Sequence, residues 1–170
     1  MQFNIRPALI GIAFAVLTLI YGFTLGINFG YNEDAIKDAI HTSGVAVLAT
    51  KYNNDEAALK KVTDKSWTYL QRAHLHAGGL GAASLCLIFV TVFIGTKPLS
   101  TRIISIALGA GSLGYAIFWA LAGFMAPELG STGAAKEALT WLAMPTSGAV
   151  VLATVWVFVL VVKKVFTRAA

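Results

Sequence analysis

The chain has 170 residues, of which 57% are hydrophobic and only 12% carry a charged side chain. A composition this apolar excludes an ordinary soluble domain and leaves room for one small membrane domain. The formal net charge is +5, but the distribution of the charges along the chain fits lipid headgroups, so nucleic-acid binding is not needed to explain it.

Four stretches of at least 24 residues contain no Asp, Glu, Lys or Arg. Roughly 20 apolar residues in a helix cross a hydrocarbon core of about 30 Å. We therefore expect an all-α integral membrane protein, a single domain over residues 1–170. Its four transmembrane helices are predicted at residues 7–30, 73–96, 103–127 and 138–162.

The first predicted helix, residues 7–30, follows Arg6 and begins with proline, a favoured first helical residue. A short basic start also describes a signal peptide, but no small-x-small cleavage site follows, so we interpret the segment as a retained helix. Gly22, Gly26 and Gly30 recur at four-residue spacing and predict a flat stripe on which another helix can pack closely.

Residues 31–72 are predicted to form a helical cap outside the membrane. Asn32 can cap a helix that starts with two acidic residues, and Asn54 can cap a second helix in the same way. No breaker separates this second helix from the apolar stretch at residues 73–96, so one continuous helix is expected to run from the cap into the membrane.

The helix at residues 73–96 begins with the most informative sequence, Arg72 to Gly81, which reads RAHLHAGGLG. Residues two apart on a helix point about 200° apart, so His74 and His76 are not expected to bind one ion from one face. Small residues accompany both histidines, with Gly78 on the His74 face and Gly79 on the His76 face, and we favour His74 as the inward one. Cys86, the only cysteine, is interpreted as a small core residue and excludes a disulfide within the chain.

The third predicted helix, residues 103–127, ends at Pro127, and the fourth, residues 138–162, contains Pro145. A proline inside a helix frees the carbonyl four residues earlier, here that of Trp141. The hydroxyls of Thr146 or Ser147 are candidates to compensate for the lost hydrogen bond.

Charge predicts the orientation of these helices. The segments before the first helix, between the second and third, and after the fourth contain six basic and no acidic residues. The other two connections contain all eight acidic residues. Since basic segments stay cytoplasmic, we expect both termini inside and the cap outside, in the periplasm of a bacterial inner membrane.

Candidate ligands gather at the outer ends of the helices. Histidine and methionine suit haem iron or copper, and glycine beside a histidine leaves room for a planar macrocycle. The predicted metal or cofactor ligands are His74, His76, His41, Met125 and Met144, and Arg72 is a partner for haem propionates. The alternative is structural: helix-end histidines that bond backbone or headgroups, methionines that fill space and glycines that serve packing.

The RAHLHAGGLG sequence is similar to helix starts in haem-bearing bacterial membrane proteins, including relatives of the haem-copper oxidases. The similarity covers ten residues, and no residue role is assigned from it.

Two hypotheses follow. In the first, the protein is a small electron-transfer subunit with one b-type haem near the periplasmic face, exchanging electrons with quinol or a periplasmic cytochrome. In the second, it is a cofactor-free accessory or assembly subunit that packs against other membrane subunits or another copy of itself. Copper handling is a weaker third. The motifs of zinc peptidases and serine hydrolases are missing, and no acidic residue lies within a predicted span, which disfavours a stand-alone enzyme or an ion-coupled transporter.

Overall fold

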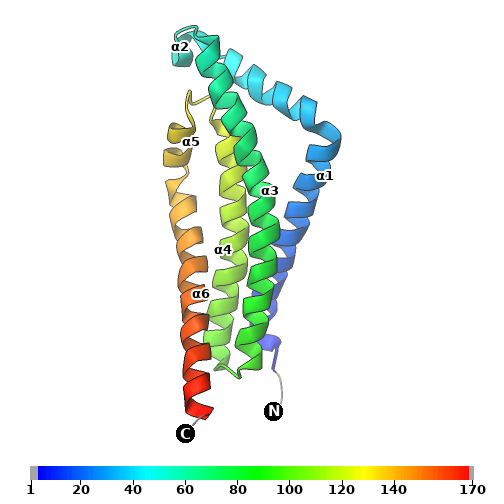
Figure 1. The fold of residues 1–170 in the computed structure, drawn as a ribbon, viewed down its shortest axis with the longest axis vertical. Coiled ribbons are helices and arrows are strands. Elements are labelled where there is room, and N and C mark those ends of the chain that lie inside the picture. Colours follow the sequence, from blue (N-terminus) through cyan, green and yellow to red (C-terminus); the bar gives the residue numbers. More distant parts are fainter. Residues whose placement is uncertain (1–3, 169–170) are drawn as a thin grey trace.

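The computed structural model describes residues 4–168, and within that range the chain is helical, with turns and no strands (Figure 1). Four of the helices are long and apolar enough to cross a membrane. The sequence-based prediction of an all-α, multi-pass membrane protein is therefore confirmed. The helices are η1 (Arg6–Ala8), α1 (Leu9–Val45), α2 (Leu48–Tyr52), α3 (Glu56–Phe93), α4 (Pro98–Met125), α5 (Thr132–Ala138) and α6 (Thr140–Arg168).

The second outer helix and the second membrane helix form one element, α3, as predicted. With 38 residues, α3 is about 57 Å long at 1.5 Å per residue. This length exceeds the hydrocarbon core of about 30 Å, so the first turns of α3 extend beyond the apolar segment. Together with α2 and the second half of α1 they form the helical cap, defined here as residues 33–72 (Figure 1).

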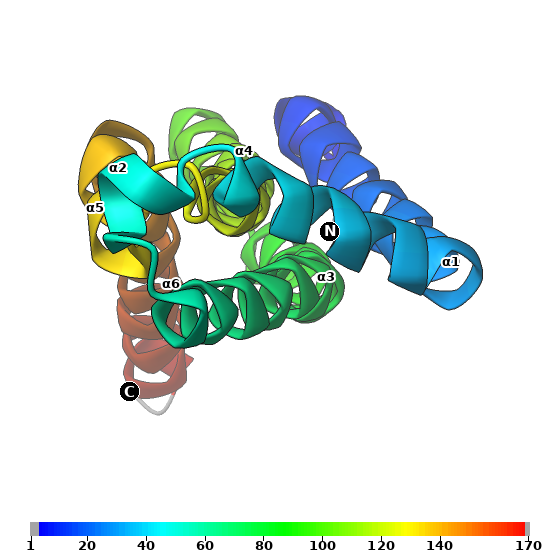
Figure 2. The same cartoon turned by 90° about the horizontal axis from the view of Figure 1, so that it is seen from above.

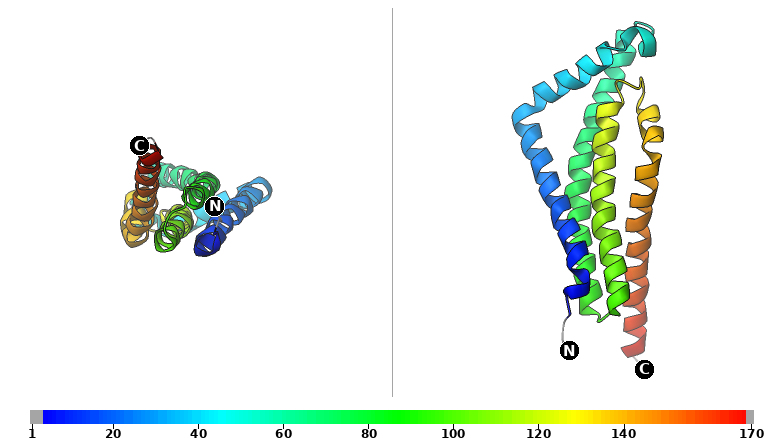
Figure 3. Two further views of the ribbon diagram at one scale, coloured as in Figure 1. Left: turned by 90° about the horizontal axis from the view of Figure 1, so that it is seen from below. Right: turned by 180° about the vertical axis from the view of Figure 1, so that it is seen from behind.

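A kink in α1 turns the chain into the cap. Asn32 has non-helical backbone angles (φ −127°, ψ 23°) inside an otherwise continuous helix, and its side-chain amide donates to Asn28 Oδ1 at 3.4 Å. Asn32 was expected to cap a new helix, and instead it bends an existing one. The second half of α1 then crosses to the beginning of α3 (Figure 3).

The start of α3 is capped one residue later than predicted. Asp55 Oδ1 accepts from the backbone N–H groups of Ala57 (2.9 Å) and Ala58 (3.0 Å). Asn54 is not the cap because it and Asn53 adopt positive φ to reverse the chain. An N-cap residue needs an extended backbone, which Asp55 has.

The membrane helices form a close-packed triad with one helix outside it. α1, α3 and α4 all contact one another, whereas α6 packs mainly on α4, on the side away from α1 (Figure 2). Half of the most apolar segment of α4 is buried (50%), against 11% of that of α6. Because α6 packs on α4 and hardly on α3, one flank of α3 has no helix packed against it.

Small residues hold the triad together. Gly11 of α1 lies against the backbone of Ser105, and a side chain at Gly11 or Gly109 would overlap the facing helix. Three residues after Gly109 on α4, the buried hydroxyl of Ser112 is hydrogen-bonded to the buried hydroxyl of Ser84 on α3 at 2.8 Å.

Pro145 lies inside α6, as the sequence predicts, and hydroxyls line the same turn. The expected acceptor is wrong: Thr146 donates to the carbonyl of Leu142 (2.5 Å) and Ser147 to that of Ala143 (2.6 Å), not to that of Trp141. The reason is geometric, since a hydroxyl on a helix reaches the carbonyl four residues before its own position.

Candidate functional site

His74 lies on the flank of α3 that faces α1. Its Nδ1 is 2.8 Å from the carbonyl oxygen of Gly22, and its ring packs edge-on to Phe29, with centroids 6.2 Å apart. A Cβ added at Gly26 would come within 2.8 Å of the imidazole Cε1. The glycine stripe of α1 therefore accommodates the His74 ring, which fills the space between the two helices.

His76 lies on the opposite flank of α3, against α4. Its ring stacks on Trp119 (centroids 5.8 Å apart, 30° between planes) and meets Tyr115 edge-on (5.3 Å, 73°). Its Nδ1 is 2.8 Å from the carbonyl oxygen of Arg72, one turn earlier on the same helix. The two histidines face different helices, as their spacing predicts, and both are half-buried.

Arg72 completes a group of aromatic and cationic side chains around His76. Its guanidinium lies over the rings of Trp119 (5.0 Å) and Tyr69 (5.4 Å), an arrangement that favours a cation electrostatically. Within residues 4–168 Arg72 makes no ion pair, and the indole Nε1 of Trp119 is buried without a hydrogen-bond partner. We call these five residues the His76 cluster: Tyr69, Arg72, His76, Tyr115 and Trp119.

Both imidazoles have the same tautomer. A carbonyl oxygen only accepts hydrogen bonds, so Nδ1 donates in His74 and in His76. In the neutral ring, the lone pair then lies on Nε2, which makes no hydrogen bond to residues 4–168 in either case. A backbone carbonyl that holds Nδ1–H and leaves Nε2 unprotonated is the usual support of a metal-ligating histidine.

Space beside the two rings differs. A Cβ at Gly79, one turn after His76, would meet no atom within 4 Å. Gly78, one turn after His74, is also open to a Cβ, but there α1 is close: a Cβ at Gly22 would lie 3.2 Å from the Gly78 nitrogen. Cys86, further along this flank, is exposed rather than in the core as predicted, because α6 does not cover it. The His76 flank therefore faces the surroundings of the protein, while the His74 flank faces α1.

The other predicted ligands are dispersed. Met125 is half-buried at the end of α4 and packs in the cluster around Tyr69 and Phe118. The side chain of Met144 is 69% exposed on α6, and His41 is in the cap. No group of three or more His, Cys, Asp or Glu side chains within residues 4–168 is arranged to hold a metal ion.

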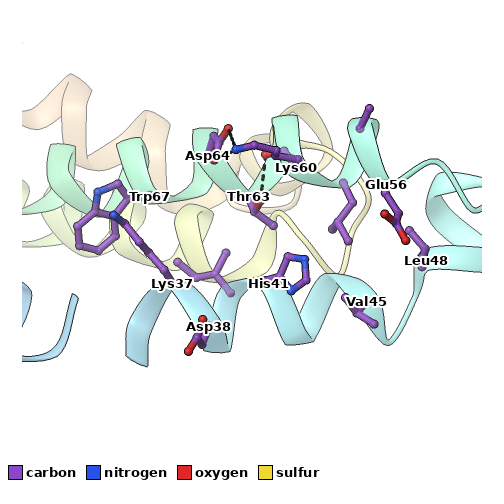
Figure 4. Close-up of a pocket in the computed structure, with 13 residues that line it drawn as sticks. Lys37, Asp38, His41, Val45, Leu48, Glu56, Lys60, Thr63, Asp64 and Trp67 are labelled. Atoms are coloured by element: carbon purple, nitrogen blue, oxygen red, sulfur yellow. Dashed lines mark hydrogen bonds and ion pairs between the residues drawn. The ribbon is translucent and has the colours of Figure 1, made fainter. Parts of the chain in front are cut away.

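His41 lies in a cleft that sequence reasoning missed. This cleft, about 780 Å³ in volume, separates the second half of α1 from the first turns of α3 (Figure 4). Lys60 pairs with Asp64 at 2.9 Å on one wall, and Lys37 extends from the other wall over the Trp67 ring (5.1 Å). The walls of the cleft come from segments on either side of the chain reversal at Asn53, so no local sequence motif indicates the cleft.

Comparison with protein-family models, with curated proteins and with solved structures gives no match for this chain. The assignment of function therefore depends on the residues themselves.

Proposed function

We propose that the protein is a small electron-transfer subunit of a bacterial inner membrane that holds one b-type haem on the open flank of α3, with His76 as an axial ligand. The observation that carries the proposal is the hydrogen bond from His76 Nδ1 to the Arg72 carbonyl, which in the neutral ring puts the lone pair on Nε2. Imidazole is a common ligand of haem iron, and a fixed ring orientation favours ligation.

The surroundings of His76 support a haem rather than a bare metal ion. Arg72, His76 and Gly79 lie at intervals of four and three residues, on one face of α3. Gly79 leaves open space for the edge of a macrocycle, and the unpaired guanidinium of Arg72 suits a propionate carboxylate. Tyr115 and Trp119 add aromatic surface next to the ring.

His76 is a better axial ligand than His74 in this proposal. The His74 ring is enclosed by Gly22, Gly26 and Phe29, and iron ligation there would require α1 to move. Met144, which is exposed on α6, or a residue of another subunit would supply the second ligand. A haem at such an interface would exchange electrons with quinol or with a periplasmic cytochrome.

The same proposal places the cap and His76 on the periplasmic side. It is supported by the charges: among residues 4–168, the segments at the helix ends away from the cap contain basic and no acidic residues. Single cysteines at exposed Thr50 and Lys97, in a Cys86→Ser background, test the orientation. A membrane-impermeant maleimide added to intact cells should label the Thr50→Cys protein and not the Lys97→Cys protein. The reverse pattern would contradict the orientation.

The test of haem binding is the spectrum of the purified protein. A reduced-minus-oxidised difference spectrum should show the sharp α-band of a b-type haem, with about one haem per chain by the pyridine haemochrome assay. A blank spectrum from cells that load other b-type proteins contradicts the proposal. Metal analysis of the same sample separates a copper protein from one without metal.

The second candidate is a cofactor-free accessory subunit of a membrane complex. It is favoured by glycines that face open space on two helices, Gly78 and Gly79 on α3 and Gly148 on α6. A partner helix can approach closely at such positions. A blank spectrum together with site-specific photo-crosslinking from position 79 to another membrane protein would support this role.

A further inference from the structure

A second pocket lies at the end of the molecule opposite the cap, where the chain enters α1 and where α4 begins. Its volume is about 530 Å³. Three residues from the start of the first helix and three from the start of α4 line it: Arg6, Pro7, Ile10, Pro98, Leu99 and Arg102. η1 and α4 are in direct contact, so the two groups of residues form one site.

The pocket has strong positive charge. Arg6 and Arg102 both line it, and neither forms an ion pair within residues 4–168. All eight acidic residues of the chain lie between residues 33 and 137, in the cap or in the connection between α4 and α6. With no carboxylate at this end of the described helices, the complement of the two guanidinium groups is an external anion.

The rest of the lining is apolar and faces outward. Ile10 is 48% exposed and Leu99 is 70% exposed, and two prolines complete the wall. The site lies at the ends of two membrane-spanning helices, where lipid headgroups meet hydrocarbon. Guanidinium groups above an apolar wall complement an amphiphile whose head is an anion and whose tail is hydrocarbon.

We propose that this pocket binds the headgroup of an anionic phospholipid. The two guanidinium groups bind the phosphate, since an arginine fork matches phosphate oxygens, and the first acyl carbons lie along Ile10 and Leu99. α1 and α4 are in close contact near the pocket, since Gly11, five residues after Arg6, lies against Ser105, three residues after Arg102. The proposal is independent of haem binding, because the pocket shares no residue with the His76 cluster.

Lipid titration of the intact chain tests the proposal. The full-length protein in a neutral detergent is titrated with dioleoyl phosphatidylglycerol or dioleoyl phosphatidylcholine, and bound lipid is counted by native mass spectrometry. Phosphatidylglycerol should bind more tightly, and the Arg6→Gln/Arg102→Gln variant should lose this preference. The expected loss is about fivefold in affinity per arginine, or about 30-fold for both.

Three controls decide between the outcomes. Lys163→Gln/Lys164→Gln removes as much charge at the same end of the molecule but outside the pocket, and it should lose less than about twofold. Arg6→Lys/Arg102→Lys keeps the charge but loses the fork, so its affinity for phosphatidylglycerol should fall between those of the wild type and the glutamine variant. An affinity equal to that of the wild type would show that charge alone binds the lipid. Inorganic phosphate at millimolar concentration should not displace the lipid. Equal losses in the arginine and lysine pairs, no preference between the lipids, or displacement by inorganic phosphate would each overturn the proposal.

Discussion

The two flanks of α3 differ in what covers them. On one flank α1 lies so close that Gly22 accepts a hydrogen bond from His74 and Gly26 contacts its ring. On the other flank His76 stacks on Trp119, and the turn that follows it faces open space. The two histidines lie within one helical turn and have the same tautomer. His74 is a packing residue on the flank that α1 covers, and His76 is a candidate ligand on the other flank.

The difference arises from where the small residues are. Glycines on α1 allow α1 to pack closely against α3. On α4, Gly111 and Gly114 contact Val150 and Thr146 of α6. α6 is therefore held on α4 and leaves one flank of α3 uncovered. A membrane helix with polar groups on an uncovered flank is expected to bind a cofactor or a partner there, because such groups are costly in lipid alone.

The largest expected effect comes from filling a glycine on each flank. Gly81→Leu, on the flank of α3 that faces α1, places a side chain against Leu19 and the carbonyl of Ala15, and it should cost about 3 kcal/mol of unfolding free energy or prevent folding. Gly79→Leu meets nothing within 4 Å and should change it by less than about 0.5 kcal/mol. Thermal unfolding in detergent measures both, and equal losses would show that the two flanks are packed alike.

Replacing each histidine by alanine sharpens the comparison. His74→Ala removes a hydrogen bond and the ring that α1 packs on, so a loss of about 2 kcal/mol is expected. His76→Ala removes a bond within its own helix and one face of an aromatic stack, so the apoprotein should lose about 1 kcal/mol or less. Denaturation of haem-free samples separates the two, and a greater loss from His76→Ala contradicts the comparison.

The contact between the cap and α4 gives a smaller effect that depends on pH. The buried Tyr52 hydroxyl donates to the carbonyl of Pro127 at 2.7 Å, so Tyr52→Phe should cost about 1 kcal/mol at pH 7. Burial raises the pKa of Tyr52 above its ordinary value of 10.0. The stabilisation is therefore complete below pH 10 and is lost as the pH rises through the folded-state pKa.

Stability curves from pH 7 to pH 11 check this prediction. The gap between wild type and Tyr52→Phe should narrow at the alkaline end. A gap that stays constant would mean that the hydroxyl does not hold the cap to Pro127.

The smallest expected effect is at the serine pair inside the triad. Ser112→Ala removes the bond to Ser84, and hydrogen bonds between membrane helices average about 0.6 kcal/mol. Ser147→Ala, whose hydroxyl bonds only to its own helix, is the matched control and should change the unfolding free energy less. If Ser147→Ala lost as much unfolding free energy as Ser112→Ala or more, the hydrogen bond between α3 and α4 would not stabilise the protein more than a bond within α6.

The four spanning helices, the unbroken course of α3 and the opposite directions of His74 and His76 follow from the sequence, because charge and helical periodicity are local properties. Which flank of α3 is covered does not follow, because it depends on how α6 packs against Gly111 and Gly114. The same reason explains the error at Cys86. The pocket between Arg6 and Arg102 also depends on a contact between segments far apart in the sequence.

The central claim is that the uncovered flank of α3 binds the haem through His76. The most direct measurement is the haem content of the wild type, His74→Ala and His76→Ala, purified side by side and compared by reduced-minus-oxidised spectra. We predict that His74→Ala keeps the α-band despite its lower stability, and that His76→Ala loses it while the chain stays folded. Loss of the band in His74→Ala alone, or its retention in His76→Ala, would contradict this account.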